Sequence, residues 1–379
     1  MEIIFWLAIV LLIHPYFFYP LIALAIGAVN PKPIRRQDWL PMVTVLIPAF
    51  NEEDCIGATV QNKLEQNYPP EKIQIIVVSD GSSDSTDDIV KTFHDRGVML
   101  LRREGREGKA AALNAAITFA TGEIVVFSDA NSLFNKNTIR LLVENFADGD
   151  VGYVTGSLGF ITDAASATGG GAGAYIRFEN FLRIAETRCG SVIGVNGGVD
   201  AIRRRLYVDT PPNLITDFIL PLTVMVGGHR VVYDSRAISH EVGNTQLSSE
   251  FRMRVRVALR AMQGLSYMRR LLNPIRFPIE SFCIFSHKIL RYMAFLFLIA
   301  ALFSNVLLAK FSVFYQSLLI LHVLVYAVAV LGLLRVLPAW LRRVTVVPSY
   351  LLMSYAAFAV ASFKFLRGDA MATWRPRAG

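Results

Sequence analysis

The sequence has 379 residues and a formal net charge of +8, and its mean hydropathy of +0.43 is too apolar for an ordinary soluble enzyme, which indicates contact with a lipid bilayer. No nucleic-acid-binding motif accompanies the positive charge, so anionic lipid headgroups and phosphate-bearing substrates explain it better. The three cysteines, Cys55, Cys189 and Cys283, lack the spacing of a zinc site or a disulfide framework, which is typical of a reducing cytoplasm.

Four long runs contain no Asp, Glu, Lys or Arg, and each approaches the roughly 20 apolar residues that a membrane-spanning helix needs. They are residues 3–29, 292–309, 311–334 and 344–363. We expect residues 1–30 to form an N-terminal transmembrane helix, because no basic residue precedes the run; a cleaved signal peptide is the alternative. Lys32, Arg35 and Arg36 follow the run. The positive-inside rule therefore places the next domain in the cytoplasm, in a multi-pass protein of the inner or plasma membrane.

The polar block at residues 31–245 is expected to form one cytoplasmic domain. Short apolar runs at 43–47, 73–78, 98–101 and 124–127 predict buried parallel strands, with room for a crossover helix between each pair. This pattern predicts an α/β fold of three layers. Farther along we expect a loop at the glycine-rich segment 169–173, a helix at 175–188 and a strand at 230–233. Glu179 and Arg183, four residues apart on that helix, are expected to form an ion pair.

Polar residues directly follow three of the predicted strands. The segments are PAFNEE (48–53), SDGSSDST (79–86) and SDANS (128–132). A dinucleotide-binding fold would place Gly-x-Gly-x-x-Gly after its first strand, where this sequence has Asn51 and Glu52. Ligands of open α/β sheets bind at the carboxyl ends of strands, and carboxylates there suit a nucleotide and the coordination of Mg²⁺ or Mn²⁺.

Four motifs in this order resemble those of the family 2 glycosyltransferases, which have the GT-A fold. They are PAFNE (48–52), VSDGSSD (78–84), GKAAALN (108–114) and FSDAN (127–131). The resemblance runs from about residue 43 to residue 260, and the flanking apolar runs are arranged as in cellulose, hyaluronan and poly-N-acetylglucosamine synthases. It implies a GT-A-type nucleotide-sugar-binding domain inserted between transmembrane helices.

The resemblance also implies the donor and metal sites. The donor-binding residues would be Ala49, Glu52, Asp80, Lys109, Ser128 and Arg256. For Asp80 a solvated turn or helix cap is the alternative, and Arg102, Arg103 and Arg106 are expected to be solvated or lipid-facing. Asp129 would hold the metal, Mg²⁺ or Mn²⁺, on the diphosphate. Asn131 replaces the second acidic residue of the Asp-x-Asp motif, so we expect weaker metal binding.

The segment NLITDF (213–218) resembles the Thr-Glu-Asp segment of the synthases, shortened to Thr216 and Asp217. In that family the final aspartate is the catalytic base, and a positioned carboxylate contributes roughly 10²- to 10⁴-fold. Capping of a helix that begins at Phe218 is the alternative. The segment VNGGVDAIR (195–203) resembles the acceptor-site strand. There Gly197 and Gly198, with Thr216, would let a sugar approach the backbone; a tight turn is the alternative.

Residues 246–285 are expected to form amphipathic helices in the membrane interface. The apolar side of the first helix consists of Phe251, Val255, Leu259 and Met262. Arg256 falls where the synthases carry the arginine of Gln-x-x-Arg-Trp, which can neutralise a departing diphosphate; an interface arginine is the alternative. Val257 replaces the tryptophan of that motif, which puts processive polymer synthesis in doubt.

Residues 286–379 are expected to form a C-terminal membrane region of two or three spans with a basic tail. If residues 344–363 cross the bilayer, that tail lies outside, against the positive-inside rule. A re-entrant or interfacial segment removes the conflict and is favoured. Trp374 and Arg377 in the tail resemble the cytoplasmic ending of some synthases.

The sequence therefore predicts an inverting glycosyltransferase that moves a sugar from a nucleotide diphosphate sugar, expected to be UDP-linked, at the cytoplasmic face. The acceptor would be a growing polysaccharide or a membrane-bound molecule. The alternatives are non-processive transfer to a lipid, or a catalytically silent membrane protein that binds nucleotide sugars. The expected partners are the donor, a saccharide or lipid acceptor, membrane lipids and a homo-oligomer or export partner, with no nucleic acid. A transporter is disfavoured, because the spans hold almost no ionisable residues.

Overall fold

The computed structural model describes residues 1–161, 167–242, 247–334 and 336–369. Its strands lie in one mixed sheet. Eight strands within these residues follow the order β3-β2-β1-β4-β7-β6-β8-β5. Their bounds are β1 Val43–Ala49, β2 Ile73–Asp80, β3 Val98–Arg103, β4 Ile124–Ser128, β5 Leu133–Phe134, β6 Val151–Ile161, β7 Val199–Arg203 and β8 Arg230–Val242.

The four predicted N-terminal strands are confirmed and are parallel neighbours, β3-β2-β1-β4. Every residue of β1 is buried, as expected for a strand covered on both faces. Beyond β4 the direction changes, because β7 pairs antiparallel with both β4 and β6. Ser128, the last residue of β4, pairs with Val199, the first of β7. The carboxyl ends of β1, β2 and β4 therefore meet the amino end of β7 at one edge of the sheet.

Helices cover both faces of the sheet, which confirms the three-layer α/β arrangement. One face packs with α5 Lys109–Ile117, α7 Ala167–Cys189 and α8 Thr216–Val226. The other packs with α3 Ile56–Leu64, α4 Thr86–Lys91 and α6 Thr138–Glu144. The remaining helices are α1 Glu2–Ile13, α2 Phe18–Val29, α9 Leu247–Tyr267, α10 Pro278–Ile284, the π-helix Phe285–Ile289, α11 Leu290–Tyr292, α12 Ala294–Leu308, α13 Val313–Leu333 and α14 Ala339–Leu366.

Two expectations for the region of α7 are wrong. The glycine-rich segment expected to be a loop belongs to the helix, which starts at Ala167. Glycine weakens a helix by about 1 kcal/mol per residue, but α7 packs against α2, α14 and β8. The expected pair of Glu179 with Arg183 does not form. Glu179 instead contacts His287 and Arg291, and Arg183 donates from Nε to the carbonyl of Gly194 at 2.7 Å.

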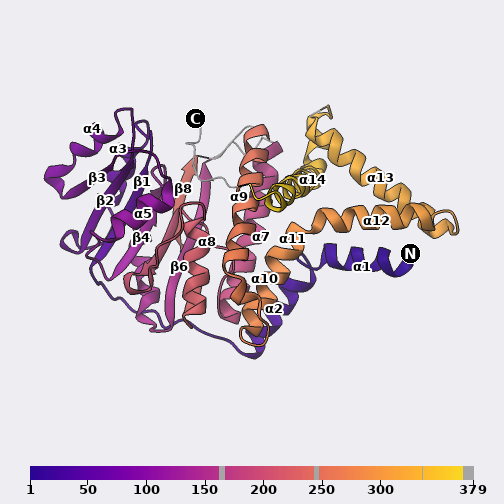
Figure 1. Ribbon diagram of the computed structural model, residues 1–379, viewed down its shortest axis with the longest axis horizontal. Coiled ribbons are helices and arrows are strands. Elements are labelled where there is room, and N and C mark those ends of the chain that lie inside the picture. The colour runs from indigo at the N-terminus through magenta and orange to yellow at the C-terminus, as the bar shows by residue number, and fades with distance from the viewer. Residues whose placement is uncertain (162–166, 243–246, 335, 370–379) are drawn as a thin grey trace.

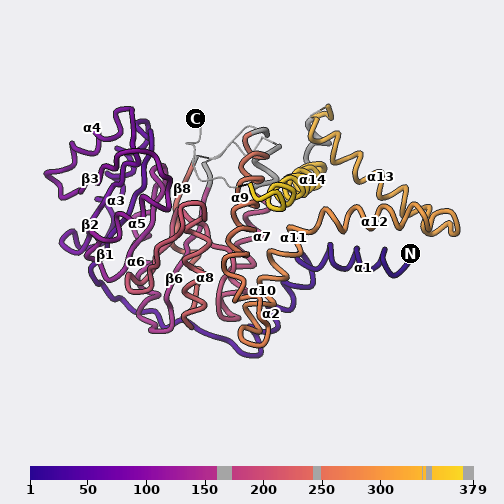
Figure 2. The backbone as a smooth tube through the Cα atoms, viewed as in Figure 1, coloured from indigo at the N-terminus to yellow at the C-terminus, as the bar shows by residue number. Residues whose placement is uncertain are grey.

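The single N-terminal helix expected over residues 1–30 is also wrong. The chain forms α1 and α2, which are bent by 55° at a short break, and Figure 2 shows this change of direction. Pro15 lies in the break, where it removes a backbone donor and its ring crowds the preceding turn. A second bend, of 61°, separates Pro278–Tyr292 from α12.

Within the described residues, two helices are long and apolar enough to cross a membrane, Val313–Leu333 and Val344–Leu366, and up to four if each bent pair is one span. Figure 1 shows α1, α12 and α13 projecting away from the sheet, with α7 and α9 between them and the sheet. The helix α14 is unbroken, so it has no re-entrant turn, and it is seen nearly end-on, crosswise to α1 and α12 (Figure 1). Trp374 and Arg377 lie outside the described residues.

The apolar side of α9 packs against α14 and is not left open to lipid. Val255, Ala258 and Leu259 form a buried cluster with Ala357 and Ala361. The amphipathic pattern was therefore detected correctly, but a neighbouring helix covers most of this face.

Candidate active site

The edge where β4 meets β7 carries the residues expected to bind the metal. Ser128 ends β4 and is buried. A turn follows, closed by the N–H of Ser132 donating to the carbonyl of Asp129 at 3.1 Å. Asp129 and Asn131 both lie in this turn and are partly exposed.

Lys109 links the turn at residues 129–132 to Asp217, the expected catalytic base. It is the first residue of α5, and its Nζ lies 2.7 Å from Asp129 Oδ1 and 3.2 Å from Asp217 Oδ2. Burial alone would lower the pKa of Lys109, but the two carboxylates outweigh burial and raise that pKa well above its usual value. The ammonium group is therefore charged and holds two carboxylates together.

Asp217 lies in the first turn of α8, which begins at Thr216 and not at Phe218. No side-chain capping bond is formed at this helix start, so the capping alternative is wrong. A carboxylate in the first turn is favoured by the helix dipole. Burial nevertheless raises the pKa of Asp217, against the opposing effect of Lys109. A higher pKa makes the carboxylate a better proton acceptor at neutral pH.

Gly197 and Gly198 form a sharp bend beside Asp217, which agrees with the tight-turn alternative; acceptor binding at this segment stays a prediction. Gly197 has φ of 85°, and a Cβ added there would lie 2.4 Å from Asp217 Oδ2. A Cβ on Gly198 would lie 2.5 Å from Glu241 Oε1. A side chain at either position would displace the end of a carboxylate side chain, and at Gly197 the positive φ would strain it as well. Thr216 Oγ1, nearby in sequence, is buried without a hydrogen-bond partner in the described part of the chain.

The donor-side residues lie at the ends of β1 and β2. Asp80 is 5% exposed and accepts hydrogen bonds from the N–H of Gly108 at 2.6 Å and from Arg103 Nη1 at 2.9 Å. The expectation that Arg103 is solvated or lipid-facing is wrong, because tertiary pairing with Asp80 draws it inward; Arg102 and Arg106 are exposed.

The other two donor-side residues are held by local contacts. Ala49 is buried at the end of β1. The N–H of Glu52 donates to Thr86 Oγ1 at 2.8 Å, and the Sγ of Cys55 donates to Glu52 Oε2 at 3.1 Å.

The helix α9 brings arginines toward the loop before Asp217. Arg260 Nη2 lies 3.5 Å from the carbonyls of Pro212 and Leu214. Arg256 lies one turn earlier on α9 and is half-buried. Val257 is 48% exposed, so the position of the synthase tryptophan is open to solvent or to a bound molecule.

Two buried residues that support the site were not identified from the sequence. Lys63 is fully buried and donates from Nζ to the carbonyl of Ser132 at 2.6 Å, behind the turn at residues 129–132. Asp200 on β7 is fully buried and accepts from Tyr153, Thr155 and the N–H of Gly197. A lysine on an otherwise apolar helix face and an aspartate within an apolar strand were the available signals.

Comparisons with known proteins relate this chain to the glycosyltransferases. The model of glycosyl transferase family 2 matches residues 44–207. Poly-beta-1,6-N-acetyl-D-glucosamine synthase of Staphylococcus aureus (strain MSSA476) is 27% identical over 237 residues, which cover 61% of this chain and 57% of that protein. A probable glycosyltransferase of Bacillus subtilis (strain 168), YdaM, is 36% identical over 118 residues, 30% of this chain and 28% of that protein. The chain thus matches little more than half the length of the first of these relatives.

A solved structure is similar over nearly the whole chain. It is the mannosyltransferase PcManGT from Pyrobaculum calidifontis in complex with GDP-Man and Mn²⁺, with 25% sequence identity and a TM-score of 0.70. The alignment covers 96% of this chain and 99% of that one. The similarity therefore includes the helices outside the sheet as well as the α/β domain.

Proposed function

This chain belongs to the family 2 glycosyltransferases, and we propose that it transfers a sugar, with inversion, from a nucleotide diphosphate sugar to a saccharide or lipid acceptor at the membrane. The observation that carries the proposal is the Lys109 ammonium lying between Asp129 and Asp217. It places a fixed positive charge and two partly exposed carboxylates at the edge of the sheet where ligands of such folds bind.

In the proposed reaction Asp217 Oδ takes the proton of the acceptor hydroxyl. The acceptor oxygen forms a bond to the anomeric carbon while the bond from that carbon to the diphosphate breaks, and the nucleoside diphosphate leaves with the electron pair. Lys109 and Arg256 are the cations proposed to offset the charge that develops on the leaving group. Gly197, which has no side chain, lets the Asp217 carboxylate lie against the backbone.

A divalent cation fits the residues at the end of β4, although no group of three or more His, Cys, Asp or Glu side chains within the described ranges could hold a metal alone. Asp129 and Asn131 are hard oxygen donors in one exposed turn. Mg²⁺ is commonly held by one or two carboxylates together with substrate phosphates. We propose that these two residues hold Mg²⁺ or Mn²⁺, which when bound would polarise the diphosphate.

The proteins that this chain resembles indicate which donors and acceptors to test first. The similarity to a mannosyltransferase solved with GDP-Man and Mn²⁺ makes GDP-mannose the first donor to test, beside the UDP-sugars suggested by the sequence. The similarity to a poly-N-acetylglucosamine synthase supports a saccharide acceptor. The exposed Val257 in place of a tryptophan supports transfer of one or a few sugars, which sizing of the radiolabelled product on a gel would separate from a ladder.

We propose that α1, α12 and α13 cross or enter the membrane, that residues 31–245 lie in the cytoplasm and that α14 lies along the interface. The crosswise direction of α14 (Figure 1) supports this placement. It also resolves the charge conflict, because the chain beyond α14 then stays on the cytoplasmic side.

The decisive experiment is Asp217→Asn in the purified full-length protein. We expect transfer to fall by about 10²- to 10⁴-fold, while binding of the nucleotide sugar, measured by calorimetry, stays unchanged. Turnover equal to that of the wild type would contradict the proposal, and a donor screen with and without EDTA would test the metal.

A further inference from the structure

Asp200 is a buried carboxylate that the proposed reaction does not use. Its side chain has no exposed surface, and no Lys, Arg or His forms an ion pair with it among the residues that the structure describes. A buried carboxylate without a cation beside it is costly, so its presence calls for a reason other than stability. Burial, and then the neighbouring Asp217 carboxylate, raise the pKa of Asp200 to about 7.

The hydrogen bonds of Asp200 converge on the turn that contacts the base. Oδ2 accepts from the N–H of Gly197 at 3.0 Å and from the hydroxyl of Tyr153 at 2.8 Å. Oδ1 accepts from Thr155 Oγ1 at 2.6 Å, and that hydroxyl in turn accepts from the N–H of Asn196 at 3.1 Å. Two consecutive backbone donors of the turn are therefore fixed by one buried carboxylate and its partner.

The turn fixed in this way lies directly against Asp217. Gly197 is held at φ of 85°, a conformation that glycine adopts without strain. Its Cα faces the carboxylate so closely that a Cβ would lie 2.9 Å from Asp217 Cγ. A change in the Gly197 backbone would change both the space beside the base and the direction of its carboxylate.

We propose that Asp200 is a positioning residue for the base: through Gly197 it fixes the orientation of Asp217 and the width of the acceptor site beside it. The inference rests on the proposed role of Asp217. It requires that loss of the Asp200 contacts reduce the rate of the chemical step. Donor binding should stay intact, because the proposed donor-binding residues Asp80 and Glu52 form their hydrogen bonds with other parts of the chain.

The test compares Asp200→Ala and Asp200→Asn in the full-length protein with GDP-mannose and Mn²⁺. We expect Asp200→Ala to lower kcat by about 10- to 100-fold, with the donor KM changed by less than about twofold. Asp200→Asn keeps an oxygen that can accept from the N–H of Gly197, so it should recover most of the lost rate. A merely structural role would lower the unfolding temperature and the yield of folded protein. It would not make the kcat of Asp200→Ala lower than that of Asp200→Asn.

A matched control is Asp234→Asn, which changes a similarly buried carboxylate on β8 that contacts Asn145 and not Gly197. It should lower the unfolding temperature and leave kcat unchanged. An unchanged kcat in Asp200→Ala, or equal losses in Asp200→Ala and Asp200→Asn, would overturn the inference.

Asp217→Asn in the same assay separates the two proposals. If Asp217→Asn retains turnover, the base assignment fails; if it loses turnover and Asp200→Ala does not, only the role of Asp200 fails. If the wild type shows no turnover of GDP-mannose, a crystal structure of Asp200→Ala decides. The inference expects Gly197 to leave its positive φ and Asp217 to move from Lys109, and an unchanged turn would overturn it.

Discussion

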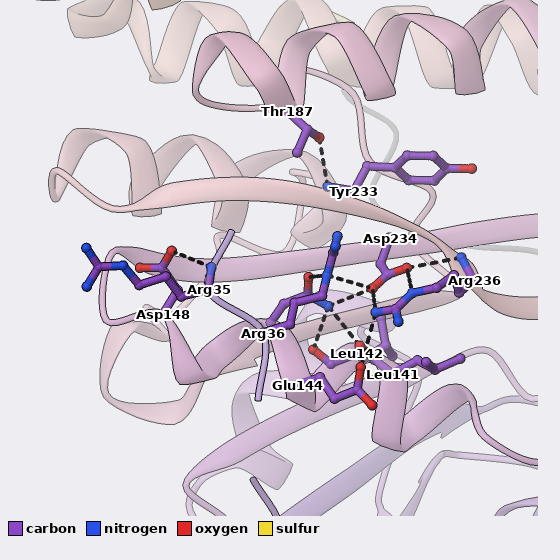
Figure 3. A network of polar contacts seen from close by, with 11 residues as sticks. Arg35, Arg36, Leu141, Leu142, Glu144, Asp148, Thr187, Tyr233, Asp234 and Arg236 are labelled. Carbon is purple, nitrogen blue, oxygen red and sulfur yellow. Dashed lines mark hydrogen bonds and ion pairs between the residues drawn. The ribbon is translucent and has the colours of Figure 1, made fainter. Parts of the chain in front are cut away.

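Asp200 and Asp234 are both hidden in the same sheet, with exposures of 0% and 2%, yet their surroundings are opposite. Asp234 Oδ2 lies 2.7 Å from Arg236 Nη2, 2.9 Å from Asn145 Nδ2 and 3.5 Å from Arg36 Nε, a network drawn in Figure 3. Burial alone would raise the pKa of Asp234, but these hydrogen bonds and Arg236 lower it. No such cation contacts Asp200 in the part of the chain that the structure describes.

The difference indicates two roles. Asp234 holds separate segments of the chain together, whereas Asp200 contacts the turn beside Asp217. Through Arg36, Asp234 attaches the segment before β1 to β8 and α6 (Figure 3). Asp200 is buried near Asp217 without a cation among the described residues, which raises its pKa, and titrating groups shifted in this way gather at functional sites. Burial alone therefore does not distinguish the two roles, whereas the partners of each carboxylate do.

The largest effect is expected from Lys109→Met, which removes the cation between Asp129 and Asp217. Loss of a fixed charge at the reacting centre should lower turnover by about 100-fold or more, because Asp129 and Asp217 then repel each other. Initial rates of sugar transfer measure this. Lys109→Arg keeps the charge and should retain more activity; turnover of Lys109→Met within about twofold of the wild type would contradict the role of the cation.

Around Asp234, which pairs with Arg36 and Arg236, the change Asp234→Asn should cost about 1–3 kcal/mol of unfolding free energy. The loss stays below that of a fully buried pair, because Arg36 and Arg236 are 39% and 46% exposed and water can solvate them. Denaturant unfolding in detergent measures it. Asp88→Asn, which breaks an exposed pair with Lys91, is the control and should cost well under 1 kcal/mol; equal losses would remove the contrast.

The smallest expected effect concerns pH. The folded protein holds the Asp200 proton up to a pKa of about 7, whereas the unfolded chain releases it near pH 4. Stability from this group therefore falls as pH rises between those values, by about 1 kcal/mol between pH 5 and 6. Asp234 has the opposite sign, because its lowered pKa gives stability that is lost as pH falls. Unfolding temperatures at several pH values should decline less steeply with rising pH in Asp200→Asn than in the wild type; identical slopes would show that Asp200 does not titrate in this range.

The parallel half of the fold could be predicted because its strands are apolar throughout and end in polar residues at regular spacing. The antiparallel strand β7 was recognised only by resemblance, and β6 was missed, since alternation and turn signals there are weak. The break at Pro15 was missed because the apolar run around it is uninterrupted, and hydropathy is insensitive to helix direction. The continuity of α7 through its glycines depends on packing that no local pattern records.

The position of a candidate residue could be predicted where it directly follows a strand, as for Asp129, but its contacts could not, because they depend on the three-dimensional fold. The sequence places Arg103 among other arginines, and only the fold shows that it pairs with Asp80. Asp217 was identified from its motif, but its contact with Lys109 joins residues 108 positions apart. Asp200 has no signal except an aspartate in an apolar strand, which sequence alone cannot separate from a structural polar residue.

The ladder between β4 and β7 also has a consequence for engineering. The donor-side strands β1 to β4 are contiguous in sequence, whereas the turn beside the base and the base itself come from residues after β6. A chimera joined between α6 and β6 would thus exchange the proposed acceptor half of the enzyme while leaving the proposed nucleotide-binding half in one piece. Its activity would depend on whether the exchanged β7 reproduces the register Ile124↔Arg203 to Ser128↔Val199.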